Sequence, residues 1–312
     1  MKVQFWGVRG SIPTPITTAQ IQAKIQVVIQ RITAKDILSL DAKEKFLASL
    51  PKSLFGTVGG NTACVELITN SDSSFIIDAG SGIRSLGKKI SSKNNPIHIF
   101  ISHFHWDHIQ GLPFFDPLFI PNREVHFYSF MPNCKDFFAE QMKNPFFPVS
   151  IDAWSKNVHY HYIKPNSSFK IDGVEICAKE MSHPGNCYAY KFQQGNKKII
   201  YSSDVEINHN DFNDSLKNDV FFKNADALIM DAQYTLEESF EKENWGHTPF
   251  CYAVDFASGW NVKKLFLFHH EPTYDDKKLH SMLQSAQWYN EYSVDNKNIE
   301  IFLATEGTEF DI

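Results

Sequence analysis

The chain has 312 residues, of which 43% are hydrophobic and 21% charged, a composition typical of a globular protein with a sizeable core. Asp and Glu outnumber Lys and Arg by 36 to 30, and the net charge of −6 argues against generic nucleic-acid binding, which depends on neutralising phosphates. No apolar run reaches the roughly eighteen residues of a membrane span, and the first residues lack the apolar stretch of a signal peptide. The five cysteines form no Cys-x-x-Cys pair, so we expect reduced thiols and a cytoplasmic protein.

The N-terminal part predicts one strand and a helical insertion. The strand covers residues 3–8 and ends before a Gly- and Pro-containing turn. Residues 16–55 are predicted as the insertion, because isoleucine and valine recur there at three- and four-residue steps. A second helix of the insertion is expected to start near Asp41, with Glu44 completing a capping box. We expect the insertion to pack against the domain, and a lid or a dimer contact is the alternative.

The rest of the chain predicts an α/β protein. Residues 60–101 read as strand, strand, short helix and strand, whereas residues 109–165 are rich in Pro and Phe and predict a loop-rich region. That region is expected either to wall the mouth of an active site or to be a packed connection. Residues 168–204 predict strands joined by tight turns at Asp172-Gly173 and Gly195-Asn196. Further elements are expected at 227–231, 249–258, 265–269, 276–292 and 299–304.

The segment His103-Phe104-His105-Trp106-Asp107-His108 is the clearest chemical motif, because four of its six side chains can bind a metal. It follows an apolar strand, so it lies where a strand gives way to a loop. His103 and His105 point the same way on an extended backbone, and Asp107 with His108 can turn toward a second ion. Imidazole and carboxylate at this density suit zinc, manganese or iron, and the motif predicts two metals and hydrolysis.

This motif resembles the signature of the metallo-β-lactamase fold superfamily of binuclear metallohydrolases. Other segments resemble further motifs of that superfamily in the same order along the chain, each beside an apolar run: 5–13, 59–67, 75–82, 180–186, 199–204 and 265–272. The resemblance implies an αββα four-layer sandwich, formed as a single domain over residues 1–312 with the insertion at 16–55.

The resemblance also implies a ligand set for two divalent ions, with zinc as the first expectation and manganese or iron as alternatives. One ion is assigned to His103, His105 and His183, the other to Asp107, His108 and His269, and Asp204 bridges the two. His269 is preferred over His270, because side chains alternate along a strand and only one of the two should face the ions. Asp78 is expected either to orient a ligand or to cap a turn.

Trp245-Gly246-His247 resembles a motif of the phosphodiesterase branch of this superfamily. The resemblance implies that His247 protonates the leaving oxygen or holds the phosphate, and that Asp231 orients it; the alternative for His247 is a plain residue at a helix start. Asp107 is counted with the catalytic residues as well as with the ligands. Candidate substrate contacts are Asn61, Arg9 and Tyr234, although Arg9 suits an internal salt bridge equally well.

The first hypothesis is therefore a hydrolase that cleaves a small nucleotide-like or cyclic phosphodiester with a metal-bridging hydroxide. One alternative is hydrolysis of a carboxylic ester, a lactone or a β-lactam, and another is a metal-containing protein that binds or senses a nucleotide. Processing of tRNA is disfavoured, because no Gly-, Pro- and Lys-rich arm is visible in the acidic chain. The expected partners are a small-molecule or nucleotide substrate and, as a possibility, a second copy, but no membrane.

Overall fold

Two seven-stranded sheets form the centre of the computed structural model, which describes residues 1–164, 167–212, 221–294 and 298–312. In spatial order the first sheet contains β14 (Glu309–Asp311), β1 (Lys2–Gly7), β2 (Cys64–Ile68), β3 (Ser74–Ile77), β4 (Ile97–Phe100), β5 (Val125–Ser129) and β6 (Val158–Tyr162). The second contains β13 (Glu300–Leu303), β12 (Lys264–Phe268), β11 (Ala227–Asp231), β10 (Lys197–Ser202), β9 (Cys187–Gln194), β8 (Val174–Met181) and β7 (Ser168–Ile171). In each sheet one half is parallel, β3 to β6 and β10 to β13, and the other half is antiparallel.

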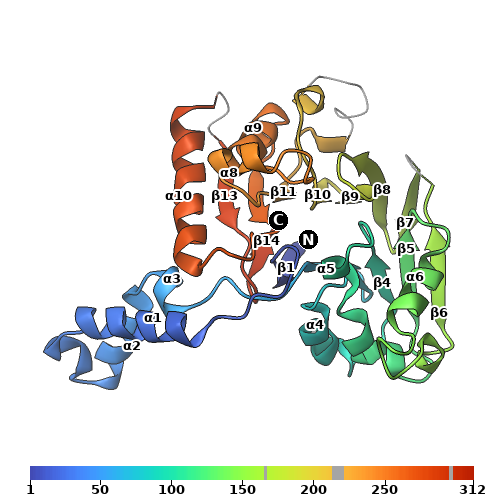
Figure 1. Cartoon of the computed structure of the whole chain (residues 1–312), viewed down its shortest axis with the longest axis horizontal. Helices are drawn as coiled ribbons and strands as arrows, with labels where there is room; N and C mark the ends of the chain where they lie inside the picture. The colour runs from blue at the N-terminus through green and yellow to red at the C-terminus, as the bar shows by residue number, and fades with distance from the viewer. Residues whose placement is uncertain (165–166, 213–220, 295–297) are drawn as a thin grey trace.

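Helices cover the outer face of each sheet, which gives the predicted αββα order of layers (Figure 1). Helices α4 (Ile83–Ile90) and α6 (Cys134–Gln141) belong to a core that includes side chains of β3, β4 and β5. On the other side, α9 (Phe250–Gly259) contacts β11 and β12, and α10 (Asp276–Tyr292) contacts β13. The largest core includes Phe5 and Phe100 from the first sheet and Phe192 and Phe268 from the second, and it extends to side chains of α9 and α10. The four-layer fold is thus confirmed.

The sequence patterns explain which strands are covered on both faces. Strand β1 alternates between buried and half-buried residues, whereas all five residues of β11 are buried. A continuous apolar strand such as Ala-Leu-Ile-Met is typical of a parallel strand between a second sheet and a helix layer. In α4 the buried residues Ile83, Leu86 and Ile90 recur at helical spacing and form the face that packs on the first sheet.

The insertion consists of α1 (Thr18–Arg31), α2 (Leu40–Ser49) and α3 (Lys52–Phe55), and it projects from the body between β1 and β2 (Figure 1). None of the residues of these three helices is buried. The predicted capping box at Asp41 and Glu44 is wrong, because Ser39 caps α2 by accepting the amide of Ala42 at 3.1 Å. The side chain of Asp41 pairs instead with Lys45, one helical turn later.

The region 109–165 is more regular than its composition predicts, although residue 165 lies outside the described part of the chain. It contains α6 and the parallel strands β5 and β6, which the sequence analysis did not identify. Histidines and tyrosines within these strands hide the apolar pattern that predicts a buried strand. Strand β14 and the short helix α8 (Leu236–Glu241) were missed as well. Both predicted tight turns do join neighbouring antiparallel strands, β7 with β8 and β9 with β10.

Over the described ranges, no helix combines the length and the apolar character that crossing a bilayer requires.

Candidate metal centre and catalytic histidine

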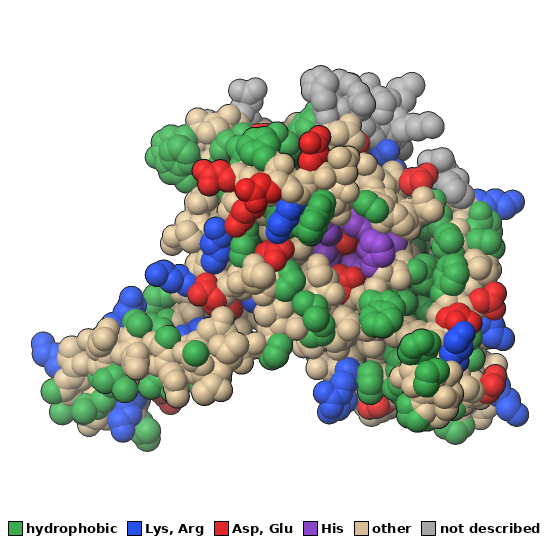
Figure 2. Space-filling view, in the orientation of Figure 1, with side chains coloured by type: hydrophobic (Ala, Val, Ile, Leu, Met, Phe, Trp, Pro, Cys, Tyr) green, Lys and Arg blue, Asp and Glu red, His purple; other side chains and the backbone are tan. Residues whose placement is uncertain are grey.

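The predicted ligands gather where the parallel strands of both sheets end. The motif after β4 supplies two short segments: His103 and His105 lie in the loop, and Asp107 with His108 lies in the four-residue helix α5 (Trp106–Ile109). Figure 2 shows a group of histidine side chains in a hollow on the face of the molecule. Chain segments far apart in sequence therefore meet at one edge, as parallel strands place their carboxyl ends together.

Two groups of potential ligand atoms share one carboxylate. The first group is His103, His105, His183 and Asp204, and the second is Asp107, His108, His269 and Asp204; within each group the ligand atoms lie within 4.8 Å of one another. His183 Nε2 is 3.2 Å from His105 Nδ1 and 3.8 Å from Asp204 Oδ1. His108 Nε2 is 2.9 Å from the other oxygen of Asp204. The carboxylate of Asp204 is therefore turned toward both groups.

Asp78 supports the second group of potential ligands through hydrogen bonds. Its Oδ2 lies 2.7 Å from His108 Nδ1 and accepts hydrogen bonds from the hydroxyls of Ser102 and Tyr201. Its Oδ1 accepts the amide of Ser102. This network holds His108 by Nδ1 and leaves Nε2 for the site, which is how carboxylates orient metal-binding histidines. The orienting role, rather than a turn cap alone, fits these contacts.

Two backbone groups hold further side chains of the donor groups in place by hydrogen bonds. The amide of Ser11 donates to Asp107 Oδ2 at 2.7 Å. His183 Nδ1 lies 2.8 Å from the carbonyl of Gly246, so this ring too presents Nε2 to the site. Gly246 has φ +87°, and a Cβ there would lie 2.2 Å from His183 Nδ1, so only glycine fits this close approach.

Burial and charge set the protonation of the cluster. Burial lowers the pKa of His103 well below its ordinary value, and a neutral ring is the form that binds a metal. Burial would also raise the pKa of Asp204, but the neighbouring histidines, His108 first, hold it well below its usual range. For His108, burial opposes the charge, yet Asp204 and Asp107 raise its pKa well above the ordinary value. Cationic and anionic groups thus stabilise each other inside the protein.

The donor set fits divalent metal ions. His103 Nε2 is buried and has no hydrogen-bond partner, although it lies 3.8 Å from Asp204 Oδ1. A buried ring nitrogen without a partner is costly unless something else binds it. Imidazoles and carboxylates that converge in this way are the ligands of zinc, manganese and iron.

His269, and not His270, lies in the cluster. Strand β12 ends at Phe268, and His269 has the left-handed φ of +59°. Its Nε2 lies 3.1 Å from Asp107 Oδ2, whereas His270 Nε2 lies 2.8 Å from the carbonyl of Ala304. The predicted choice agrees with this geometry, but a backbone turn, rather than strand alternation, separates the two rings. Asp78 and Asp204 have similar positive φ values, as expected of residues held in unusual conformations at functional sites.

His247 and Asp231 form a pair at the rim of the cluster. His247 Nδ1 lies 2.7 Å from Asp231 Oδ2, while Asp231 Oδ1 accepts the amides of Gln233 and Thr248. Burial would lower the pKa of His247, but the carboxylates around it, Asp231 first and then Asp204 and Asp107, together raise the pKa to about 9. The two residues also form a third potential ligand group with Asp204 and His269. Because both oxygens of Asp231 are already engaged, it fits an orienting role better than a ligand role.

Comparisons with known proteins agree with this geometry. The sequence model of the β-lactamase superfamily domain matches residues 74–270, more than half of the chain. The chain belongs to this superfamily. Ribonuclease Z of Picrophilus torridus is 25% identical over 289 residues, which cover 76% of this chain and 86% of that protein.

Solved structures share the fold over the whole chain. The metallo-β-lactamase fold protein YhfI from Bacillus subtilis superposes with a TM-score of 0.64 at 16% identity and covers 99% of both chains. A diphosphatase from the PhnP family superposes with a TM-score of 0.63 at 16% identity and covers 100% of this chain and 97% of that one. The fold is therefore the metallo-β-lactamase fold.

Two of the three side chains predicted to contact the substrate, those of Arg9 and Asn61, form hydrogen bonds with other residues of the protein. The guanidinium of Arg9 is buried and donates to the carbonyls of Gly59, Glu271 and Tyr274. This is the internal role, with carbonyls in place of the expected acidic partner. Asn61 donates from Nδ2 to Glu306 at 2.9 Å, and its Oδ1 accepts the hydroxyl of Ser81. These contacts do not favour either prediction, because they engage both side chains within the protein.

Tyr234 does lie against the cluster, and it brings a residue that the sequence analysis missed. Its ring is 5.8 Å from that of His247 in an edge-to-face arrangement. Lys242 Nζ lies 4.1 Å from the centre of the same ring and 5.9 Å from that of Trp245, and 3.7 Å from Glu271 Oε2. A lysine three residues before the Trp-Gly-His motif was the available signal. Lys242 thus supplies a positive charge against the ring of Tyr234, which in turn contacts His247.

Proposed function

We propose that this metallo-β-lactamase fold hydrolase cleaves a phosphodiester with two divalent metal ions, zinc by first preference, bound by the two donor groups. His103, His105 and His183 would hold one ion, Asp107, His108 and His269 the other, and Asp204 both. Bound there, the ions would supply Lewis acidity and activate water for attack on phosphorus.

The observation that carries the proposal is the hydrogen bond between His247 and Asp231. Because Asp231 engages Nδ1, the ring can present only Nε2 to a substrate. The same carboxylate stabilises the protonated ring, so His247 is suited to donate a proton from Nε2 to the leaving oxygen. An alkoxide leaving group needs such a proton, whereas hydrolysis of a β-lactam or of an activated ester depends on it less.

Other residues of the chain would position the substrate. Tyr234 packs against His247 and limits the movement of its ring. Lys242 lies against the ring of Tyr234 and would attract a non-bridging phosphate oxygen. Asp107, fixed by the amide of Ser11, would keep its carboxylate aligned in the second group while charge develops on the substrate.

The test is a comparison of three chromogenic substrates with the metal-loaded enzyme. We expect turnover of bis-p-nitrophenyl phosphate with added zinc or manganese, and little turnover of p-nitrophenyl acetate or nitrocefin. Turnover of the acetate or nitrocefin without the phosphodiester would reject the proposal in favour of an ester or β-lactam hydrolase. A purified protein that retains an uncleaved nucleotide and turns over none of the three would support the sensor alternative.

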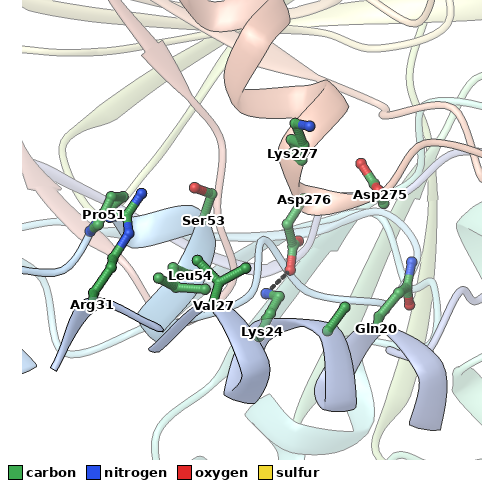
Figure 3. A pocket seen from close by; sticks show the side chains of 11 residues that line it. Gln20, Lys24, Val27, Arg31, Pro51, Ser53, Leu54, Asp275, Asp276 and Lys277 are labelled. Carbon is green, nitrogen blue, oxygen red and sulfur yellow. Dashed lines mark hydrogen bonds and ion pairs between the residues drawn. The ribbon is translucent and has the colours of Figure 1, made fainter. Parts of the chain in front are cut away.

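The 3′ end of an RNA is a second candidate substrate, favoured by the insertion and by the ribonuclease Z relative. Over residues 16–55, six basic side chains outnumber three acidic ones: Lys24, Arg31, Lys35, Lys43, Lys45 and Lys52 against Asp36, Asp41 and Glu44. The insertion is thus a basic arm on an acidic protein, which the sequence analysis did not recognise. Figure 3 shows its root, where Lys24 Nζ lies 2.5 Å from Asp276 Oδ2 beside a cavity of about 410 Å³.

Basic side chains away from this root provide the test of the RNA candidate. We expect K35Q/K43Q to weaken cleavage of an RNA with a 3′ extension and to reduce its salt dependence, without affecting bis-p-nitrophenyl phosphate. Equal RNA cleavage by the double variant and the wild type would show that these basic side chains of the insertion do not contribute to RNA cleavage. Light scattering of the same samples measures whether the predicted homodimer forms.

A further inference from the structure

An aromatic cleft opens beside the proposed metal centre. It has a volume of about 600 Å³ and lies between α5 with the turns after it and α6 with residues 146–147. Phe104 packs on Phe137 with ring centres 4.9 Å apart, and Phe114 packs on Phe147 edge to face at 5.6 Å. These pairs form two rigid aromatic walls.

Trp106 joins the cleft to the metal centre. It is the first residue of α5 and 76% exposed, while the next two residues of the same helix, Asp107 and His108, are buried in the second donor group. Adjacent Cα atoms are about 3.8 Å apart, so the short backbone segment that presents Trp106 to the cleft also carries two side chains of the donor groups. Figure 2 shows hydrophobic side chains gathered beside the hollow that contains the histidines.

The lining selects a flat and uncharged group. Besides Trp106, Phe114 and Phe146 are 54% and 71% exposed, which leaves large ring faces open to solvent. Among the described residues that line the cleft, Glu140 is the one charged side chain, and it pairs with Lys143. The cleft therefore offers no cation to a phosphate, and a phosphate would stay at the donor groups.

A fixed amide adds a polar feature to the cleft. Gln141 donates from Nε2 to the carbonyl of Ile109 at 3.1 Å, while its buried Oε1 has no hydrogen-bond partner. Because a buried acceptor without a partner is unfavourable, this oxygen is suited to accept a hydrogen bond from an N–H group of a ligand.

We propose that this cleft binds the nucleobase next to the scissile phosphodiester, so that the substrate is a nucleotide or a nucleic-acid end rather than a simple alkyl phosphodiester. This inference rests on the proposed phosphodiesterase function. Trp106 and Phe146 would stack on the base, and Gln141 would accept from its N–H. The cleft has the volume of a small-molecule pocket, which favours a base over a protein partner that needs a much wider surface.

The experiment compares two diesters with the same leaving group, thymidine 5′-(p-nitrophenyl phosphate) and methyl p-nitrophenyl phosphate. For the wild type we expect a higher kcat/KM with the thymidine ester. In W106A and F146A we expect the ratio of the two kcat/KM values to fall about tenfold or more, because stacking is lost. W288A is the matched control, since Trp288 on α10 is 61% exposed but lies outside the cleft, and its ratio should equal that of the wild type.

Binding of free thymidine, measured by calorimetry on metal-loaded protein, separates this inference from the proposed function. Thymidine binding that W106A abolishes supports the cleft even if neither diester is cleaved, in which case only the proposed function fails. Unchanged ratios in both cleft variants, with thymidine binding retained, would overturn the inference. A change in oligomeric state on light scattering with unchanged ratios would also overturn it, because the rings would then belong to a protein interface.

Discussion

The chain contains two clusters of histidines, and each includes a His-x-His pair. His103 and His105 lie in the loop after β4 and take part in the proposed metal centre, whereas His159 and His161 lie within β6. The second pair joins a row of rings along the first sheet, where His126 stacks on His159 with centres 4.9 Å apart and planes 22° apart. The same spacing of histidines therefore gives a convergent cluster in one place and a stack of rings in the other.

Carboxylates and backbone turns account for the difference. Every potential metal-binding group found in the described part of the chain contains Asp204. In the stack, His126 is hydrogen-bonded to Glu124 and lies 2.9 Å from His161, and Glu124 is exposed. Extended strands keep the stacked rings parallel, whereas the left-handed backbone at Asp204 and His269 turns side chains toward one point. Acidic partners at turned strand ends, rather than histidine spacing, thus distinguish a metal site.

Removing the carboxylate of Asp204, which all the potential metal-binding groups share, should have the largest effect on metal content and activity. We expect D204A to lose bound metal from both groups and at least about a thousandfold in kcat/KM, because Lewis acidity of this kind contributes several kcal/mol. Elemental analysis after gel filtration and steady-state kinetics measure the two effects. H161A, which alters only the stack, should keep the metal content and the activity of the wild type. Full metal content in D204A would mean that the ions are bound elsewhere.

Replacing the histidine at the rim should affect the reaction but not the metal content. We expect H247A to lower kcat by about 10² to 10⁴ for a diester with an alkyl leaving group, and much less for one with p-nitrophenol, which leaves without a proton. D231N should show the same dependence on the leaving group with a smaller loss, because it leaves Nε2 in place. Equal losses for both leaving groups would show that His247 acts only by shaping the site.

Replacing Asp78, whose carboxylate lies beneath the cluster, should have an intermediate effect on metal affinity. D78N keeps the shape of the side chain but removes the charge that holds His108 by Nδ1, and we expect metal affinity to fall about 10- to 100-fold. A titration of the metal-free protein with metal ions should show weaker binding of the ion assigned to the second group. The ion assigned to His103, His105 and His183 should be less affected. Equal weakening of both ions would contradict the division into two groups.

The sequence was sufficient for the fold, and it named the side chains that the structure gathers into two potential donor groups, because each of them lies at the end of an apolar run and keeps the order of a known superfamily. The strands β5 and β6 were not predicted, because His and Tyr occupy many of their positions and replace the aliphatic pattern that predicts a strand. Packing against other rings, such as Phe100 on Tyr128 at 4.7 Å, stabilises these side chains in the sheet, and such tertiary contacts are invisible to local pattern analysis.

Substrate contacts were the least predictable part. Arg9 and Asn61 have the right chemistry for phosphate, yet neighbouring carbonyls and Glu306 engage them. Whether a polar side chain is free depends on the partners that folding brings to it, and here these include residues more than two hundred positions away. Lys242 illustrates the reverse case, since only the structure places its charge beside Tyr234.

A glycine at the metal centre tests whether close packing supports the first group. G246A should shift His183, because the new Cβ would lie 2.2 Å from Nδ1, and we expect metal binding about tenfold weaker. Alanine at φ +87° also costs about 1–2 kcal/mol of stability. G173A is the matched control: Gly173 has φ +79° with open space around it, so it should lose stability but not metal affinity. Equal metal affinity in both variants would exclude the steric explanation.

The stack itself should produce the smallest effect, a dependence of stability on pH. Burial, with His126 stacked at 5.0 Å, lowers the pKa of His98 to about 4, and its Nδ1 lies 3.1 Å from the hydroxyl of Tyr128. The other titratable groups acting on His98 are Asp172, Glu124 and His161, and the two carboxylates only partly offset the burial.

Below a pH of about 6.5 the unfolded chain therefore binds a proton at His98 that the folded protein does not bind until about pH 4, and stability falls across this interval. Between pH 7 and 5, urea unfolding should show the wild type losing on the order of 1 kcal/mol more than H98F, whose ring does not titrate. Since the metal centre is the same in both proteins, its own titration cancels in the difference. Identical pH dependence of the two proteins would mean that His98 is protonated as easily in the sheet as in the unfolded chain. The structure implies the opposite, namely that the stack disfavours a charged ring at His98.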